Sequence, residues 1–412
     1  MTRKKMSKKK SISSDIVVMG NGITSQFFSL VLSKTIGERI KISQIDKKIK
    51  AQDYVRALSI SLSTVNICKV LDIWSLIEPY CYPVKKIIVT HRDMQKSKAS
   101  ILEFDNQIDQ NIASYIINES DLRKILSQQI VKYKNIELFE TEINSLDIDN
   151  QSATISSDRY DFSSKLIVAG DGRSSIIKKI LGIKSITWDY DQTALSCLIT
   201  HTKKNDNIAI ENFLNTGPIA ILPFGDYQSS LIWSGSRTFM NDLKKVDRYK
   251  LLEEVQTQTK AYTGKISNIE NIGYFDLNFS IIRKLIHRRV AFIGDAAHSV
   301  HPLAGQGTNI GLRDVAYLSE NIIDSIKYGL DFSDKNALQE YERKRMPDIV
   351  TSAMTFDAIN RLYSNNIRAI EPLKDFAINF VSKVPTLKKS FVEEGAGTKR
   401  AMSKLIQGIP IS

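Results

Sequence analysis

The fold of this chain is decided by residues 15–25, DIVVMGNGITS, in which a short apolar run ends at two closely spaced glycines. The β-branched residues of the run predict a buried strand over 15–19, and apolar residues at helical spacing follow from Ile23 onward. A second, alternating strand is expected over 40–45, and it ends at Asp46. Strand, glycine turn, helix and strand within about 30 residues predict a βαβ unit.

The glycine turn occupies the position of a dinucleotide fingerprint, G-x-G-x-x-G. Gly20 permits the tight turn, and Gly22 lets the backbone approach a pyrophosphate at the amino terminus of the new helix. Ser25 stands where the third glycine packs helix against strand, so we expect a small serine to be tolerated at some cost in fit. Asp46, about 20 residues further on, is placed to accept hydrogen bonds from ribose hydroxyls. On this fingerprint alone, an ordinary βα turn stays open as the alternative.

Asp171 and Asp295 each follow a predicted buried strand, in the turns Gly170-Asp171-Gly172 and Gly294-Asp295. Both carboxylates are therefore expected at the carboxyl ends of strands, where doubly wound sheets bind ligands.

Residues 301–309, HPLAGQGTN, continue the second of these turns. Their small residues and closely spaced glycines permit a flat ligand to approach the backbone. Helical periodicity begins at about Asn309, and the amino terminus of a helix there would stabilise negative charge on a ligand.

His298 and His301 form an H-x-x-H pair, but no further cluster of histidines, cysteines or carboxylates with metal spacing accompanies it. We therefore expect no metal site, and we interpret both histidines as structural or loop-positioning. Cys68, Cys81 and Cys197 are scattered and form no CxxC motif, which is typical of buried thiols in a reducing compartment.

The formal net charge is +12, and the first ten residues, MTRKKMSKKK, hold six basic residues and no acid. No apolar stretch follows them, so they do not form a secretory signal, and no apolar run is long enough for a transmembrane helix. We interpret residues 1–13 as a disordered basic tail, with attraction to an anionic membrane surface as the alternative. Nucleic-acid binding is not expected, because no aromatic residues are interleaved with basic ones in the rest of the chain.

Taken together, the three turns resemble those of the class A FAD-dependent aromatic monooxygenases, which have the p-hydroxybenzoate hydroxylase fold. Four further segments are similar to the ubiquinone-biosynthesis hydroxylases within that class; they are RALSI (56–60), WDYDQTAL (188–195), TGPIAILP (216–223) and YERKR (341–345). The resemblance covers residues 14–410.

The resemblance implies an α/β fold: a Rossmann-like FAD-binding domain, an inserted, mostly antiparallel β-sheet substrate domain, and C-terminal helices. The expected parts are the FAD-binding domain (14–80, 100–185 and 281–336), the substrate domain (81–99 and 186–280) and a C-terminal helical region (337–412). Within the last region, an apolar stripe is expected either to pack on the flavin domain or to contact a membrane; it comprises Ile370, Leu373, Phe376, Ala377, Phe380 and Val381.

The resemblance also implies the cofactor site, and it names no catalytic residue. The expected FAD-binding residues are Gly20, Gly22, Ser25, Asp46, Arg56, Arg123, Asp171, Gly172, Gly294, Asp295, Pro302, Gly305, Gly307 and Asn309. Within this set, the resemblance implies that Arg56 and Arg123 contact the FAD phosphates and flank the flavin. It places Asp171 near the FAD pyrophosphate and associates it with pyridine nucleotide as well. Asp295 hydrogen-bonds the ribityl chain. The loop facing the isoalloxazine ring contains Pro302, Gly305, Gln306 and Gly307.

The implied reaction is hydroxylation of the ring of a polyprenylated phenol through a flavin C4a-hydroperoxide. O₂ is the co-substrate, and NAD(P)H or another electron donor reduces the flavin. Further expectations are contact with other ubiquinone-biosynthesis proteins and a cytoplasmic location, with peripheral contact at the inner face of the cytoplasmic membrane left open. The ring position, the donor, a general base and the oligomeric state are not determined by the motifs.

Two alternatives to this interpretation stay open. One is another enzyme on the same fold, such as a flavin halogenase or a hydroxylase of a small aromatic compound. Halogenases of this type carry a W-x-W-x-I-P segment, whereas Trp74, Trp188 and Trp233 are isolated. The other is a binding protein without catalysis.

Overall fold

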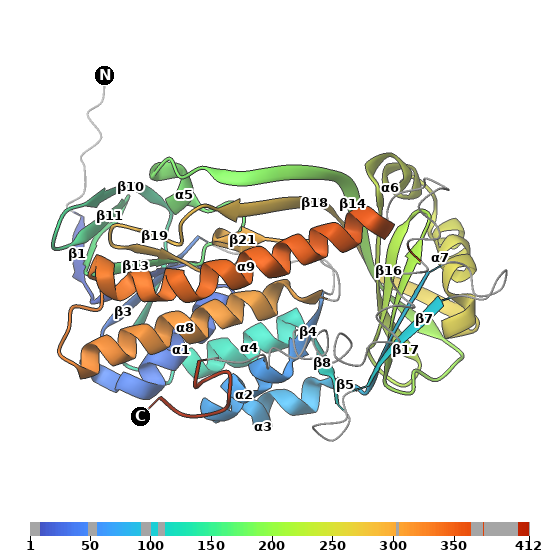
Figure 1. Cartoon of the computed structure of the whole chain (residues 1–412), viewed down its shortest axis with the longest axis horizontal. Helices are drawn as coiled ribbons and strands as arrows, with labels where there is room; N and C mark the ends of the chain where they lie inside the picture. The colour runs from blue at the N-terminus through green and yellow to red at the C-terminus, as the bar shows by residue number, and fades with distance from the viewer. Residues whose placement is uncertain are drawn as a thin grey trace.

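The computed structural model describes residues 9–47, 56–91, 100–105, 112–301, 305–363, 374 and 403–411. Two larger sheets organise the chain: a six-stranded sheet covered by helices, and an eight-stranded sheet that reaches the other end of the molecule (Figure 1). The predicted α/β architecture with an inserted, mostly antiparallel sheet is confirmed.

The six-stranded sheet consists of β2 (Ile16–Met19), β3 (Ile42–Asp46), β9 (Ile136–Glu140), β13 (Leu166–Ala169), β19 (Ile286–His287) and β20 (Val290–Phe292). Its order is β19-β20-β13-β2-β3-β9, and all strands except the edge strand β19 run parallel. Every residue of β2, β13 and β20 is buried. Continuously apolar strands are typical of a parallel sheet that is covered on both faces.

One face of this sheet is covered by the helices α1 (Ile23–Ile36), α4 (Glu119–Ile130) and α8 (Gly307–Lys327), which pack side by side (Figure 1). The other face carries a four-stranded sheet with the order β1-β12-β11-β10. Its strands are β1 (Lys10–Ser13), β10 (Ile143–Ile148), β11 (Ala153–Ser157) and β12 (Tyr160–Ser164).

Strand β1 corrects the prediction that disorder extends to residue 13. It pairs in parallel with β12, from Lys10 opposite Tyr160 to Ser13 opposite Ser163. The edge of β12 supplies backbone partners that the local sequence does not reveal, and Lys9 Nζ lies 3.6 Å from a carboxylate oxygen of Asp161. The more basic residues 1–8 lie outside the described part of the chain.

The eight-stranded sheet has the order β21-β18-β14-β17-β16-β15-β6-β7. Its strands are β6 (Lys86–His91), β7 (Ser100–Asp105), β14 (Ser185–His201), β15 (Ile208–Leu214), β16 (Gly217–Pro223), β17 (Gln228–Ser236), β18 (Ile266–Ile282) and β21 (His298–Ser299). Figure 1 shows the long strands β14 and β18 spanning both parts of the molecule. Helices α6 (Arg237–Leu243) and α7 (Arg248–Thr263) cover one face around Trp233, which is fully buried.

Two strands lie in a different sheet from the one expected. β7 pairs with β6 in the eight-stranded sheet, although residues from 100 onward were expected in the FAD-binding part. Conversely, β5 (Tyr82–Val84) pairs with β8 (Ser114–Asn118), which also pairs with β4 (Ala57–Ser61). Both pairings join segments that are distant in sequence, so local patterns did not reveal them.

The other described elements are α2 (Leu62–Val70), α3 (Trp74–Ile77), α5 (Ile176–Ile180), α9 (Lys335–Tyr363) and the 3₁₀ turns η1 (Gly37–Arg39), η2 (Glu78–Tyr80) and η3 (Gly294–Ala296). Helix α9 packs on α8 (Figure 1). No helix in the described ranges is long and apolar enough to cross a membrane.

The expectation that the chain is helical from 337 to its end is only partly met. Residues 403–411 form turns rather than a helix, with Gly408 at φ 77° and Pro410 just after it. A positive φ and a proline both end helices. Leu405 and Ile406 of this segment are buried in the main core. All the residues of the predicted apolar stripe lie outside the described part of the chain.

Candidate active site

The first glycine turn has one glycine that the fold requires and one that it does not. Gly20 has φ 96°, and a Cβ on it would lie 2.6 Å from the carbonyl oxygen of Gly170. Gly22 is the N-cap of α1 with φ −77°, and a Cβ there would meet nothing within 4 Å. No side chain caps the helix at this point. The protein therefore leaves room and unpaired N–H groups at Gly22, as a bound phosphate requires.

Asp46, at the end of β3, stabilises this turn through its carboxylate. Its carboxylate accepts a hydrogen bond from the backbone N–H of Asn21 at 2.7 Å and another from Lys47 at 2.7 Å. The side chain is only partly buried, and each carboxylate oxygen can accept a further bond. A structural role at the turn and a bond to ribose are therefore compatible.

Ser25 is fully buried where the fingerprint has its third glycine. Its hydroxyl lies 3.1 Å from the carbonyl oxygen of Gly170 and 3.3 Å from that of Met19. A Cβ on Gly170 would lie only 2.4 Å from Ser25 Oγ. Gly170, which has no side chain, thus leaves room for the Ser25 hydroxyl. This room offsets the expected cost of serine to the packing of helix against strand.

Positive charge lies beside the glycine turn. Arg123 donates a hydrogen bond to the carbonyl oxygen of Asn21 at 3.1 Å. Glu119, which is nearly buried, contacts both Arg123 at 3.4 Å and Arg56 at 3.3 Å. Two arginines share one carboxylate, so a net positive charge remains beside the uncapped end of α1, where it would attract a pyrophosphate.

The second turn holds an unsatisfied carboxylate. One oxygen of Asp171 accepts the backbone N–H of Ile176 at 2.7 Å, and the other is buried without a hydrogen-bond partner in the described structure. Burial raises the pKa of Asp171. Gly172 follows at φ 79°. An unpaired buried acceptor at this edge would suit a hydroxyl-bearing ligand.

The third turn is held by Asp314, a fully buried carboxylate in α8. It accepts hydrogen bonds from the backbone N–H of Gly294 at 2.9 Å, from His298 Nε2 at 2.6 Å and from Arg345 Nε at 2.8 Å. Burial alone would raise the pKa of Asp314, but His298 and Arg345 outweigh it and the pKa is lowered. This contact agrees with a structural role for His298. Asp295, next to Gly294, is half-buried, and its carboxylate has no hydrogen bond to the described residues.

The amino terminus of α8 is also open. Its N-cap, Gln306, makes no capping hydrogen bond, Gly305 has φ 63°, and a Cβ on Gly307 would meet nothing within 4 Å. Pro302, predicted to face the same ligand, lies outside the described residues. Unpaired N–H groups at a helix start are suited to negative charge.

The side chain of Asn309 is occupied by hydrogen bonds within the fold. Its Oδ1 accepts hydrogen bonds from the backbone N–H of Ser61 at 3.1 Å and from Thr64 Oγ1 at 3.0 Å. Its Nδ2 donates to the carbonyl oxygen of Ser59 at 2.9 Å. The side chain thus ties α8 to β4 and α2, and only its backbone is left for a ligand. Ser59, Ser61 and Thr64 were missed because they are far from Asn309 in sequence.

The structure brings the three turns together around the start of α1. A Cβ on Gly20 would lie 2.9 Å from Asp171 Cα, and one on Gly294 would lie 3.0 Å from Thr24 Oγ1. The described residues contain no group of side chains that could hold a metal ion. The site therefore offers hydrogen-bond donors at two open helix ends, positive charge from two arginines, and one unpaired carboxylate. This combination fits an extended anionic dinucleotide rather than a metal ion.

Comparison with known proteins decides the assignment, because the FAD-binding domain family matches residues 14–356. This chain belongs to that family. The FAD-binding chain is also 27% identical to ubiquinone hydroxylase UbiL of Rhodospirillum rubrum, over 96% of this chain and 93% of that protein. It is 26% identical to the mitochondrial ubiquinone biosynthesis monooxygenase COQ6 of Dictyostelium discoideum, over 93% of this chain and 91% of that protein.

The fold of this FAD-binding protein is similar to that of p-nitrophenol 4-monooxygenase PnpA from Pseudomonas putida. The TM-score is 0.77 at 14% identity, covering 95% of this chain and all of the other. The predicted resemblance and fold class are confirmed, and the chain is an FAD-dependent monooxygenase.

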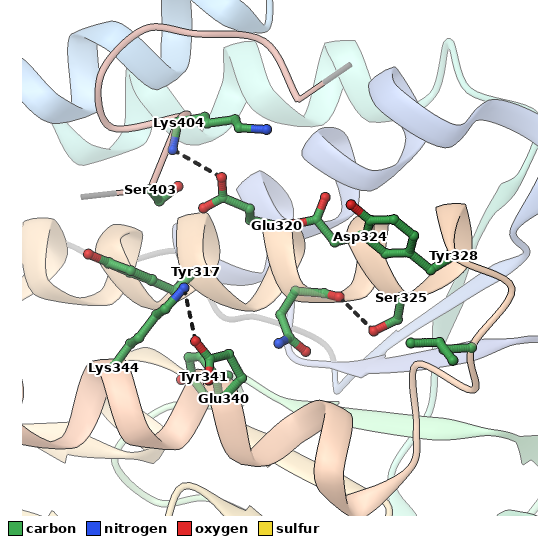
Figure 2. Close-up of a pocket in the computed structure, with 12 residues that line it drawn as sticks. Tyr317, Glu320, Asp324, Ser325, Tyr328, Glu340, Tyr341, Lys344, Ser403 and Lys404 are labelled. Carbon is green, nitrogen blue, oxygen red and sulfur yellow. Dashed lines mark hydrogen bonds and ion pairs between the residues drawn. The ribbon is translucent and has the colours of Figure 1, made fainter. Parts of the chain in front are cut away.

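A separate cavity of about 480 Å³ lies between α8, α9 and residues 403–404, as Figure 2 shows. Its lining begins at Tyr317, ten residues along α8 from Gly307, which corresponds to about 15 Å of helix. The cavity is therefore distinct from the site formed by the three turns. Acidic and basic side chains both line it, including Glu320, Asp324 and Lys344.

Proposed function

We propose that this monooxygenase hydroxylates the aromatic ring of a polyprenylated phenol in ubiquinone biosynthesis. The observation that carries the proposal is that three turns with space and unpaired polar groups for a ligand lie together at the start of α1. The near full-length likeness to proteins named ubiquinone hydroxylase and ubiquinone biosynthesis monooxygenase supports the substrate class.

In this proposal the ADP part of FAD lies along the first turn. Gly22 leaves space for the pyrophosphate, whose charge is balanced by the end of α1, Arg56 and Arg123. Asp46 accepts from the ribose. Ser25 acts indirectly, by holding α1 against β13 through Gly170.

The second and third turns would hold the flavin half. Asp171 and Asp295 have carboxylate oxygens free to accept hydroxyls of the ribityl chain. The open end of α8, at Gly305 and Gly307, stabilises negative charge at the flavin edge by about 0.3–1 kcal/mol when exposed, and by more when it is buried.

When bound, FAD supplies the two-electron chemistry and the activation of O₂. The chain orients the ring and excludes water. Between the eight-stranded sheet and the β4-β8-β5 sheet lies an apolar cluster that includes Val84, Ile116, Ala209 and Leu222. This packed core holds the two sheets together and keeps water out of the junction between them.

The proposal also includes NAD(P)H or another electron donor, O₂, contact with other ubiquinone-biosynthesis proteins, and a cytoplasmic enzyme in peripheral contact with the membrane. Arg3, Lys4, Lys5 and Lys8, which precede strand β1, support the last point, because each basic residue adds about 1 kcal/mol of attraction near an anionic surface.

Deleting the gene tests the proposed function in the cell. We expect a prenylated phenol that lacks one hydroxyl to accumulate while ubiquinone falls, with both reversed by the wild-type gene. Mass spectrometry of extracted quinones would identify the missing ring position. An unchanged quinone profile would refute the proposal.

A further inference from the structure

His301 lies in a buried hydrogen-bonded cluster where three elements meet. Its Nε2 is 3.2 Å from Oε1 of Gln192 in β14, and Asn360 of α9 donates to the same oxygen at 3.2 Å. The edge of the Tyr190 ring packs against the imidazole, with ring centroids 5.3 Å apart. His301 is 1% exposed. The cluster thus connects the residue preceding the flavin-facing loop to the eight-stranded sheet and to α9.

These contacts determine the tautomer of His301. With the Gln192 amide oriented so that Asn360 donates to its oxygen, that oxygen can only accept, and the imidazole hydrogen is assigned to Nε2. Burial lowers the pKa of His301 to about 3, so the ring is neutral at physiological pH. Nδ1 therefore carries a lone pair and acts only as an acceptor.

That acceptor has no donor. Nδ1 of His301 is buried and has no hydrogen-bond partner in the part of the chain that the structure describes. The large majority of buried polar side-chain atoms are hydrogen-bonded. A neutral acceptor that is held by Gln192 and lies four residues before Gly305 in the sequence indicates a donor that arrives with a ligand.

We propose that His301 Nδ1 accepts the hydrogen bond of the substrate's ring hydroxyl, an assignment that rests on the function proposed above. A phenol O–H is a donor of the kind that the buried Nδ1 lacks, and the ring of Tyr190 packs against the same imidazole. The neutral imidazole offers no charge to a ring carboxylate, so it selects phenols over benzoates. Accepting this bond also increases electron density in the ring, which favours attack on an electrophilic oxygen.

Two substitutions test the roles of Nδ1 and Nε2 of His301 independently. His301→Gln can keep a donor to Gln192 at the place of Nε2 but has no acceptor at the place of Nδ1. His301→Asn can place an oxygen where Nδ1 was but loses the contact with Gln192. The probes are 2-prenylphenol and prenylbenzene, which differ only in the hydroxyl, titrated into each FAD-loaded protein while the flavin absorbance is followed.

We expect the wild type and His301→Asn to bind the phenol roughly tenfold more tightly than prenylbenzene, as one net hydrogen bond provides. His301→Gln is expected to bind both alike. Retention of the phenol preference by His301→Gln, or equal binding of the two probes by the wild type, would overturn the role of His301. Failure of the wild type to bind either probe would instead refute the proposed substrate class and, with it, this assignment.

A measurement on the wild type covers the case in which the variants do not fold. The chain has five histidines, so nitrogen-15 labelling of histidine gives a spectrum simple enough to assign. We expect a buried Nε2–H tautomer whose Nδ1 resonance moves when 2-prenylphenol is added to the holoenzyme and stays in place with prenylbenzene. A resonance that neither probe moves would contradict the proposal.

Discussion

Ser25 and Gly170 share one space: a Cβ on Gly170 would lie 2.4 Å from the Ser25 hydroxyl oxygen, which instead lies 3.1 Å from the Gly170 carbonyl oxygen. Gly170 does not have a positive φ, so its backbone would accept a side chain. Packing against Ser25 therefore requires glycine here, and Ile293 Cγ1, which would lie 3.3 Å from the same Cβ, adds a weaker crowding. The fingerprint's missing third glycine is therefore compensated in a turn 145 residues away.

This relationship predicts that Gly170→Ala is destabilising and that Ser25→Gly rescues it. Overpacking of a filled core costs about 1–3 kcal/mol, and FAD occupancy should fall with it because α1 is displaced. Denaturant unfolding of the two single variants and the double variant measures the coupling. Additive effects in the double variant would show that the two residues do not share this space.

The Gly22→Ala variant tests whether the first glycine turn binds the cofactor or only shapes the chain. The new methyl meets no protein atom within 4 Å, so the unfolding free energy of the apoprotein should change by less than about 1 kcal/mol. The dissociation constant for FAD should rise by about tenfold or more, because the methyl occupies the space of the pyrophosphate. Fluorescence titration with FAD provides the test, and unchanged affinity would place the pyrophosphate elsewhere.

Arg123→Gln removes a charge next to the first turn. A charge-assisted hydrogen bond contributes about 1.5–3 kcal/mol, so FAD should bind at least tenfold more weakly, and the difference should shrink at high salt. Lys124→Gln is the matched control, since it is the next residue in α4, is exposed and removes the same charge. Equal losses in the two variants would indicate a general effect of net charge.

The buried imidazole of His301 predicts a pH-dependent stability. Its pKa is lowered to about 3 in the folded protein, so its neutral form contributes fully above about pH 6.5, the pKa in the unfolded chain. As pH falls below that value, the unfolded chain binds a proton that the folded protein does not. Between pH 7 and pH 5 the free energy of unfolding should drop by about 2 kcal/mol from this residue.

Denaturant unfolding of wild type and His301→Gln at the two pH values checks this drop. The variant should lack it, while His287→Gln, at an exposed position, should retain it. A drop of the same size in all three proteins would show that His301 is not the source.

The basic residues at the start of the chain predict binding to anionic vesicles. Arg3, Lys4, Lys5 and Lys8 precede strand β1, so replacing all four with glutamine leaves its pairing with β12 in place. Vesicle affinity should fall by roughly 1 kcal/mol per residue, with FAD content unchanged. Co-sedimentation with anionic and neutral vesicles measures this, and undiminished binding would assign the contact to another part of the chain.

Local sequence predicted the elements that carry the site but not the contacts between them. Each glycine turn follows a short apolar strand, so Gly20, Asp171 and Gly294 could be located from spacing alone. The partners of Asn309, the carboxylates of Glu119 and Asp314, and the pairing of Ser25 with Gly170 depend on residues brought together by folding. Strand β1 was missed for the same reason, because its partner is β12.

The most direct test of the account is a single turnover with isotopically heavy dioxygen. The holoenzyme would be reduced chemically, which removes any dependence on the natural electron donor, and then mixed with 2-prenylphenol and the labelled gas. The account predicts a ring-hydroxylated product that carries one heavy oxygen atom, with a yield that follows FAD occupancy in the Gly22→Ala variant. A fully loaded, reduced enzyme that consumes dioxygen but returns the phenol unchanged, or a product whose new oxygen comes from water, would contradict it.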